Sequence, residues 1–260
     1  MVLPGSERDA RAEFAEAHLP GAVFLDLASL TDEGSPVPYA LPRAEQVRRR
    51  LADIGAGNDA ALVLYDNSPL RSACRAWFAL RRCGVATRVL DGGLEKWRAD
   101  RLPIEQGQPA RRATRPPAPE QIDRVEGRGD VVTKDDVLAS LPDAAVPIVD
   151  ARDEERFTGT SEDPVHAMPG GHIPGARNLF FRSLLAADGT FLPPAELERR
   201  FAAAGIDPSR PLIASCGSGI TASVLLFTQH LMGYETGALY DGSWAEWGAD
   251  PATPKERGPA

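Results

Sequence analysis

Short apolar runs alternate along the chain with longer segments in which apolar residues recur every three or four positions. The continuous runs have the pattern of buried strands and occupy residues 61–65, 146–150 and 211–215. The periodic segments predict amphipathic helices, each followed by a glycine, at 43–54, 71–83, 195–204 and 220–232. Shorter strands are predicted at 23–25, 87–90, 178–180 and 238–240. Strands that alternate with helices predict a mostly parallel sheet covered on both faces.

The same order of elements occurs twice, and two motifs mark the repeat. His18-Leu-Pro-Gly-Ala22 recurs as His172-Ile-Pro-Gly-Ala176, and the segment 90–97 recurs as 240–247. Because each half has the size of an ordinary domain, we expect two similar domains, at 1–104 and 131–250. The intervening segment 105–130, rich in Pro, Arg, Gly and Gln, is predicted to be a linker.

The first half has no counterpart of the run Val146-Pro-Ile-Val-Asp150, because the repeat would place it before Met1. Two explanations stay open: the chain starts further upstream, or the first domain is shortened. The expected fold class is therefore α/β, with two domains that are each a doubly wound parallel sheet flanked by helices, the first of them shortened at its N-terminus.

Composition argues against several classes of function. The formal net charge of −8 disfavours a nucleic-acid partner, and no apolar run approaches the ~20 residues that span a bilayer. The N-terminus lacks the long apolar segment of a signal peptide. Three cysteines without a Cys-x-x-Cys pair favour reduced thiols in the cytoplasm over a disulfide framework. The four histidines show no zinc-binding spacing.

Cys216 is the candidate nucleophile. It follows the predicted strand 211–215 and precedes a helix, in the turn Cys-Gly-Ser-Gly-Ile-Thr. Glycines let successive amides turn toward one sulfur, and a helix N-terminus adds positive potential, so this position favours a thiolate. The repeat places Asp66 opposite Cys216, which predicts one catalytic centre. Cys74 and Cys83 lie on a predicted helix and are expected to be core residues.

These motifs, together with Asp241-Gly-Ser-Trp-Ala-Glu-Trp247, resemble those of tandem-domain rhodanese-type sulfurtransferases. The resemblance runs from about Arg8 to Gly248. It implies two rhodanese-like domains, with Cys216 as the catalytic residue in the second. Such enzymes take a sulfane sulfur onto the cysteine as a persulfide, without a cofactor. They pass it to cyanide or to a thiol, for which a thioredoxin-like reductant is one candidate partner.

The loop after the cysteine favours one donor. Relatives that use thiosulfate tend to have basic residues there, whereas those similar to 3-mercaptopyruvate sulfurtransferases carry Cys-Gly-Ser-Gly-Val-Thr. The loop in this chain is uncharged and is expected to bind the donor through its amides and hydroxyls; its residues are Gly217, Ser218, Gly219, Ile220 and Thr221. The favoured donor is therefore 3-mercaptopyruvate, and thiosulfate is the alternative.

The resemblance also assigns two arginines. Arg156 matches the family arginine that holds the donor's carboxylate, with a surface ion pair beside Glu154 and Glu155 as the alternative. Arg152 is expected to form a structural ion pair.

Three departures from the mercaptopyruvate pattern count against 3-mercaptopyruvate as the donor. The second arginine of some such enzymes falls near Val165 or His166, Ala28 replaces an aspartate, and Tyr39 replaces a histidine. An Asp-His pair assigned to assist Ser218 is thus missing.

Cysteine phosphatases share the strand–loop–helix thiol site but need Cys-x5-Arg, and position 222 is Ala. A catalytically silent sulfur carrier or partner-binding protein is the alternative from another class. His18 and His172 are expected to bind backbone at their turns. Trp244 is expected to fix a turn, or else to wall the pocket.

Overall fold

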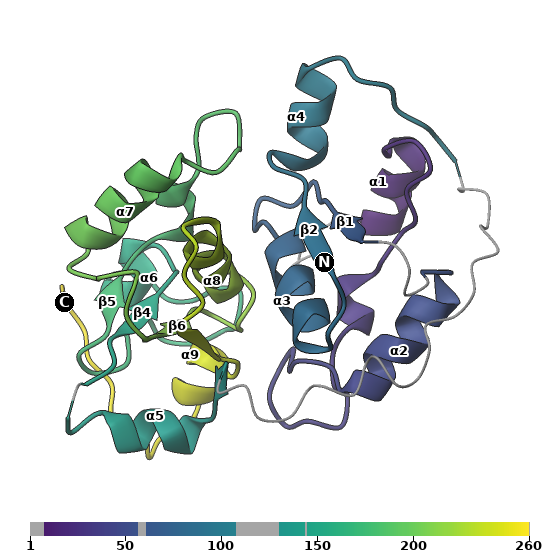
Figure 1. The fold of residues 1–260 in the computed structure, drawn as a ribbon. Coiled ribbons are helices and arrows are strands. Elements are labelled where there is room, and N and C mark those ends of the chain that lie inside the picture. Colours follow the sequence, from purple (N-terminus) through teal and green to yellow (C-terminus); the bar gives the residue numbers. More distant parts are fainter. Residues whose placement is uncertain (1–7, 57–60, 108–129, 144, 260) are drawn as a thin grey trace. The chain divides into compact units, whose positions relative to one another are not determined.

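The computed structural model describes residues 8–56, 61–107, 130–143 and 145–259 (Figure 1). Their contacts form two compact units. Unit 1 holds the described residues of Met1–Glu33, Leu41–Gly127 and Ala187–Thr190, and unit 2 those of Gly34–Ala40, Arg128–Ala186 and Phe191–Ala260. Most of the predicted linker, 108–129, lies outside the described residues. No described helix is long and apolar enough to cross a membrane.

Unit 2 contains a five-stranded sheet in the order β3-β7-β6-β4-β5. The strands are β3 (Val131–Val132), β4 (Ile148–Asp150), β5 (Arg177–Asn178), β6 (Leu212–Ser215) and β7 (Gly237–Tyr240). Every pairing in it is parallel, which confirms the predicted sheet type. All residues of β4 and β6 are buried, and this double-sided cover explains their continuous apolar runs. β3, with two residues, is too short for a sequence pattern to predict.

Helices cover both faces of this sheet (Figure 1). They are α5 (Lys134–Ser140), α6 (Glu154–Thr158), α7 (Pro194–Ala203), α8 (Ala222–Leu231), α9 (Ser243–Trp247) and the 3-10 helix η3 (Phe181–Leu184). Side chains of α5, α6 and α9 share one core with Ile148 and Ile213 of neighbouring strands. α8 packs against β6 and β7. A capping box forms at the start of α5, where Thr133 and Asp136 bond each other's backbone amides.

Unit 1 has a similar design with fewer strands. β1 (Leu62–Leu64) pairs in parallel with β2 (Thr87–Val89). Its helices are α1 (Ala10–Glu16), the 3-10 helix η1 (Leu27–Ser29), α2 (Ala44–Asp53), α3 (Ala73–Arg82) and α4 (Gly93–Ala99). The predicted helices 43–54 and 71–83 are confirmed as α2 and α3, which pack together through Val47, Leu51 and Leu80.

Two predictions about unit 1 are wrong. Residues 23–25 form no strand, and β1 is not covered on both faces, because the side chain of Val63 is 60% exposed. Its counterpart in unit 2, Ile213, is 5% exposed. The first difference arises because no strand in the described part of unit 1 takes the place that β4 has in unit 2. Residues 23–25 therefore have no strand to pair with, and one edge of β1 stays open. The second concerns a face of the strand, which in unit 2 is covered by the core that Ile213 shares with α5, α6 and α9.

Candidate active site

Cys216 lies at the carboxyl end of β6, between the strand and the N-terminus of α8. Its side chain is 1% exposed. The loop 217–221 connects it to α8, which begins at Ala222. In open parallel sheets, ligands bind at the carboxyl ends of the strands and anions bind at helix N-termini. The structure thus places the candidate nucleophile in the strand–loop–helix setting that the sequence predicts.

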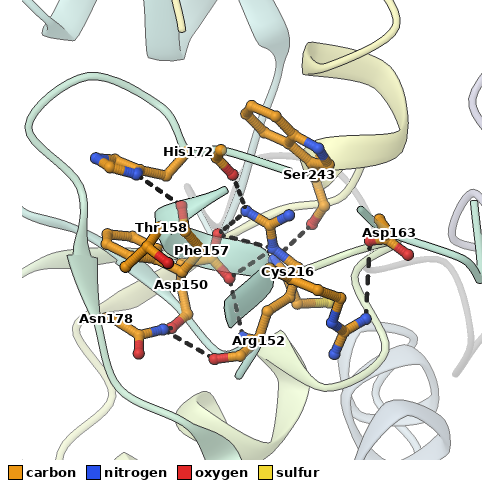
Figure 2. A network of polar contacts seen from close by, with 12 residues as sticks. Asp150, Arg152, Phe157, Thr158, Asp163, His172, Asn178, Cys216 and Ser243 are labelled. Atoms are coloured by element: carbon orange, nitrogen blue, oxygen red, sulfur yellow. Dashed lines mark hydrogen bonds and ion pairs between the residues drawn. The ribbon is translucent and has the colours of Figure 1, made fainter. Parts of the chain in front are cut away.

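Ser243, at the start of α9, holds the cysteine loop (Figure 2). Its Oγ accepts hydrogen bonds from the amides of Cys216 and Gly219, each at 3.1 Å, and donates one to the carbonyl of Tyr240 at 2.8 Å. The Gly219 amide is therefore directed to Ser243, which corrects the expectation that it faces the sulfur. Sequence reasoning overlooked Ser243, although its position inside the repeated Asp-Gly motif was a signal.

The backbone of α9 also binds this loop. The amide of Trp244 donates to the carbonyl of Cys216 at 3.0 Å, and that of Ala245 donates to the carbonyl of Gly217 at 2.8 Å. Trp244 itself is buried, and its indole N–H donates to the carbonyl of Pro169 at 3.0 Å. These contacts agree with its predicted role in fixing the turn.

The other loop amides are left for a ligand. No described residue accepts a hydrogen bond from the N–H groups of Gly217, Ser218, Ile220, Thr221 or Ala222. Ser218 and Thr221 are buried residues whose hydroxyls lie in the same loop. An uncharged loop with several donors at a helix N-terminus can bind a single negative charge such as that of a persulfide.

Arg152 is buried next to this loop (Figure 2). Its Nη2 donates to Asp150 Oδ2 at 2.7 Å and to the carbonyl of Gly171 at 2.6 Å, and its guanidinium lies 4.8 Å from the Trp244 ring centre. Burial acts to lower the pKa of Arg152, but Asp150, Asp163 and the charge of Cys216 raise it above its usual value. These contacts agree with the predicted structural ion pair and put a permanent cation within electrostatic reach of the sulfur.

Arg156, Asp163 and His166 form a second polar cluster. Arg156 donates from Nε to Asp153 at 2.7 Å, and its Nη1 lies 3.7 Å from Asp163 Oδ2. The other oxygen of Asp163 lies 3.1 Å from Nδ1 of His166. The ion pairs of Arg156 are therefore with Asp153 and Asp163, and not with the neighbouring glutamates.

His166 connects this cluster to the cysteine loop. A Cβ added at Gly217 would collide with Cε1 of the His166 ring, so the ring lies directly against the residue after Cys216. The His166 side chain is 9% exposed, and neither ring nitrogen makes a hydrogen bond to any residue that the structure describes. The sequence identified this position merely as one where an arginine is absent, because the contact with Gly217 joins distant parts of the chain.

Asp163 is the fully buried centre of the cluster. Burial acts to raise its pKa, but the close contact with His166 and the charges of His166, Arg156 and Arg152 outweigh it and lower that pKa. Asp163 is therefore a carboxylate at neutral pH, and it can hold Arg156 and His166 in place together.

His172 has the structural role that was predicted. Its ring stacks on Phe157, with ring centres 3.9 Å apart, and its Nδ1 lies 2.9 Å from the Phe157 carbonyl oxygen. His18 makes the same two contacts with Phe14 in unit 1.

Unit 1 carries Asp66 where unit 2 carries Cys216. Oδ2 of Asp66 accepts hydrogen bonds from the Ala73 amide at 2.6 Å and from the Ser72 hydroxyl at 3.1 Å, so the N-terminus of α3 already binds a carboxylate of its own chain. Cys74 and Cys83 are buried as predicted, and burial raises the pKa of Cys83 to about 11. Neither thiol has the setting of Cys216.

Comparison with known proteins agrees with this geometry. The rhodanese-like domain family matches twice, at residues 8–100 and 133–250. The 3-mercaptopyruvate sulfurtransferase of Escherichia coli (strain K12) is 37% identical over 258 residues, which are 98% of this chain and 89% of that protein. The human protein of the same name is 37% identical over 248 residues, 94% of this chain and 82% of that protein. The crystal structure of SseA from Escherichia coli has a TM-score of 0.81 at 35% identity, covering 94% of this chain and 90% of its own.

The role of Ser243 gives a stability prediction. Ser243→Ala leaves two buried amides without an acceptor and should lower the free energy of unfolding by about 1–3 kcal/mol in urea denaturation. Ser218→Ala is the matched control, because the Ser218 hydroxyl bonds no described residue, and it should stay near wild type. Equal losses in both variants would contradict the role given to Ser243.

Proposed function

This chain belongs to the rhodanese-like family, and we propose that it is a sulfurtransferase that works through a persulfide on Cys216, with 3-mercaptopyruvate as the favoured donor. The observation that carries the proposal is the uncharged loop of donors between Cys216 and α8. The names of the relatives support the same reaction.

The first half of the reaction needs a nucleophile and a place for negative charge. The Cys216 thiolate attacks the donor's sulfur; an S–S bond forms and the donor's C–S bond breaks, with its electron pair passing to the departing carbon as the enolate of pyruvate. The enolate takes up the proton that the donor's thiol brought, which leaves an anionic persulfide. The free loop amides and the N-terminus of α8 stabilise this charge, the helix by about 1 kcal/mol.

The second half returns the enzyme to its starting state. An acceptor thiolate or cyanide attacks the outer sulfur, the S–S bond breaks, and its electron pair returns to Cys216 as the thiolate. The products are a persulfide of the acceptor or thiocyanate. No change of oxidation state at a metal or cofactor is needed for either half.

We assign Arg156 and His166 to the binding of the donor. Asp163 contacts both, so the two side chains are held as one unit beside Gly217. Nδ1 of His166 lies against Asp163, so Nε2 is the ring nitrogen left for a hydrogen bond to the donor's keto oxygen, where charge develops in the enolate. Arg156 binds the carboxylate. This arrangement suits an α-keto acid, and His166 takes over the role for which related enzymes use a second arginine.

We also propose that the protein acts in the cytoplasm and passes its sulfur to a thiol there. All three cysteines are buried free thiols, a pattern typical of the reducing cytoplasm. In that compartment a small thiol or a thioredoxin-like reductant is the natural acceptor for the persulfide sulfur.

The persulfide can be detected directly. Brief exposure to 3-mercaptopyruvate should add the mass of one sulfur atom to the intact protein, and cyanide should remove it. Cys216→Ser should gain nothing, while Cys74→Ser should behave as wild type because its thiol is a core residue. An unchanged mass with every donor tried would rule out the enzyme and favour a silent carrier or binding protein.

Donor selectivity tests the Arg156–Asp163–His166 cluster. Arg156→Ala and His166→Ala should each raise the KM for 3-mercaptopyruvate about 10- to 100-fold, the range for losing a hydrogen bond to a charged group, with far smaller effects on thiosulfate. Arg200→Ala, an exposed ion-pair residue of α7, is the matched control and should change neither. If the KM values for both donors rise equally, these residues support the fold and do not select the donor.

A further inference from the structure

A proton has to move within the site during the proposed sulfur transfer, on which this inference rests. The donor brings that proton on its thiol, the persulfide is left as an anion, and the departing enolate needs one proton to become pyruvate. Cys216 is only 1% exposed, so bulk water has little access to the reacting sulfur. A side chain of the site is therefore the natural carrier of the proton between the two steps.

One described side chain around the cysteine loop is suited to this task. Arg152 and Arg156 stay protonated and cannot accept a proton, and the loop hydroxyls are not bases at neutral pH. Burial acts to raise the pKa of Asp163, but the charges around it outweigh burial and lower that pKa, so its carboxylate is a weak base. An imidazole can both accept and return a proton near neutral pH, which leaves His166.

The chain around His166 positions its ring. Backbone hydrogen bonds join Asp163 and Met168 in both directions, at 2.7 and 3.1 Å, and close the loop between them. Oδ1 of Asp163 accepts the amides of Val165 and His166 at 3.1 and 3.3 Å, and it lies 3.1 Å from Nδ1 of the ring. A carboxylate this close favours the proton on Nδ1, so Nε2 is the basic nitrogen of the neutral ring.

Nε2 lies over the residue that follows the nucleophile. The three atoms nearest to a Cβ added at Gly217 all belong to the His166 ring, with Nε2 at 3.3 Å. Gly217 does not have a left-handed backbone, so among the described contacts it is this ring that requires a glycine there. A nitrogen that is buried and bonds no described residue costs free energy unless a ligand uses it. Nε2 is therefore available to the reacting molecule.

We propose that Nε2 of His166 carries the proton of the donor's thiol to the enolate. The neutral ring accepts this proton from the donor's S–H group while the Cys216 thiolate attacks the same sulfur. The S–S bond forms, and the C–S bond breaks with its electron pair passing to carbon. The imidazolium bonds the keto oxygen through Nε2–H and then gives its proton to the enolate. Pyruvate, the anionic persulfide and a neutral His166 remain, and no oxidant or reductant is consumed.

This role distinguishes the two candidate donors by their chemistry. 3-Mercaptopyruvate brings a thiol proton, and its leaving group must be protonated. Thiosulfate brings no proton at neutral pH, and its leaving group, sulfite, departs with the electron pair of the broken S–S bond. His166 is therefore needed for turnover of 3-mercaptopyruvate and not for turnover of thiosulfate.

His166→Gln separates proton transfer from binding. The Gln amide can still donate a hydrogen bond to the keto oxygen, but it cannot carry a proton. We expect the KM for 3-mercaptopyruvate to stay near that of wild type and kcat to fall about 100-fold or more, the range for losing a general acid–base group. With thiosulfate, kcat should not change. His230→Gln, at a histidine of α8 whose side chain is 39% exposed, is the matched control and should behave as wild type with both donors.

A measurement on the wild-type protein keeps the test independent of how the variant folds. Formation of the persulfide from 3-mercaptopyruvate should be slower in D2O than in H2O, and thiosulfate supplies the baseline for solvent effects on the cysteine itself. An unchanged kcat in His166→Gln, an equal loss with both donors, or an equal effect of D2O on both would overturn the proton role. The proposed function would then still stand, because the persulfide forms. A wild-type protein that takes no sulfur from 3-mercaptopyruvate would instead overturn the function, and the proton role with it.

Discussion

The hydroxyl of Ser243 fixes the backbone on which the proposed chemistry depends. It accepts the amides of Cys216 and Gly219, and the next two residues of α9 bind the carbonyls of Cys216 and Gly217. These bonds occupy the carbonyls of Cys216 and Gly217, which would otherwise accept the hydrogen bonds that the sulfur needs. The remaining amides are left for an anion, and no solvent reorganisation is needed when charge forms there. Arg152 and Asp150 add a buried, neutralised pair beside the loop.

The two units share a scaffold but differ at the position of the proposed nucleophile. The carboxylate of Asp66 accepts hydrogen bonds at the N-terminus of α3, whereas Cys216 places at the N-terminus of α8 the thiol that we propose as the sulfur carrier. Gly93 stands where Ser243 stands in unit 2, so the silent unit also lacks the hydroxyl that holds the loop. These two differences support the prediction of one catalytic centre, at Cys216.

Local patterns predicted most of the fold and the position of Cys216, because buried parallel strands and amphipathic helices leave a continuous or periodic apolar trace. They failed where a neighbour decides the outcome. Residues 23–25 have strand character but no partner, and Val63 is apolar but uncovered. His166 could not be placed from spacing, because its importance comes from lying against Gly217, far along the chain. The Gly219 amide was misassigned for the same reason, because it donates its hydrogen bond to Ser243, which is also distant along the chain.

The central claim is that an uncharged cysteine loop, with Arg156 and His166 held beside it by Asp163, selects an α-keto acid over an inorganic dianion. The most direct test is kcat/KM for 3-mercaptopyruvate and for thiosulfate, measured on one preparation of the wild-type protein. The account predicts a preference for 3-mercaptopyruvate of about tenfold or more, which corresponds to ~1.4 kcal/mol in transition-state binding. A preference of that size for thiosulfate would contradict it.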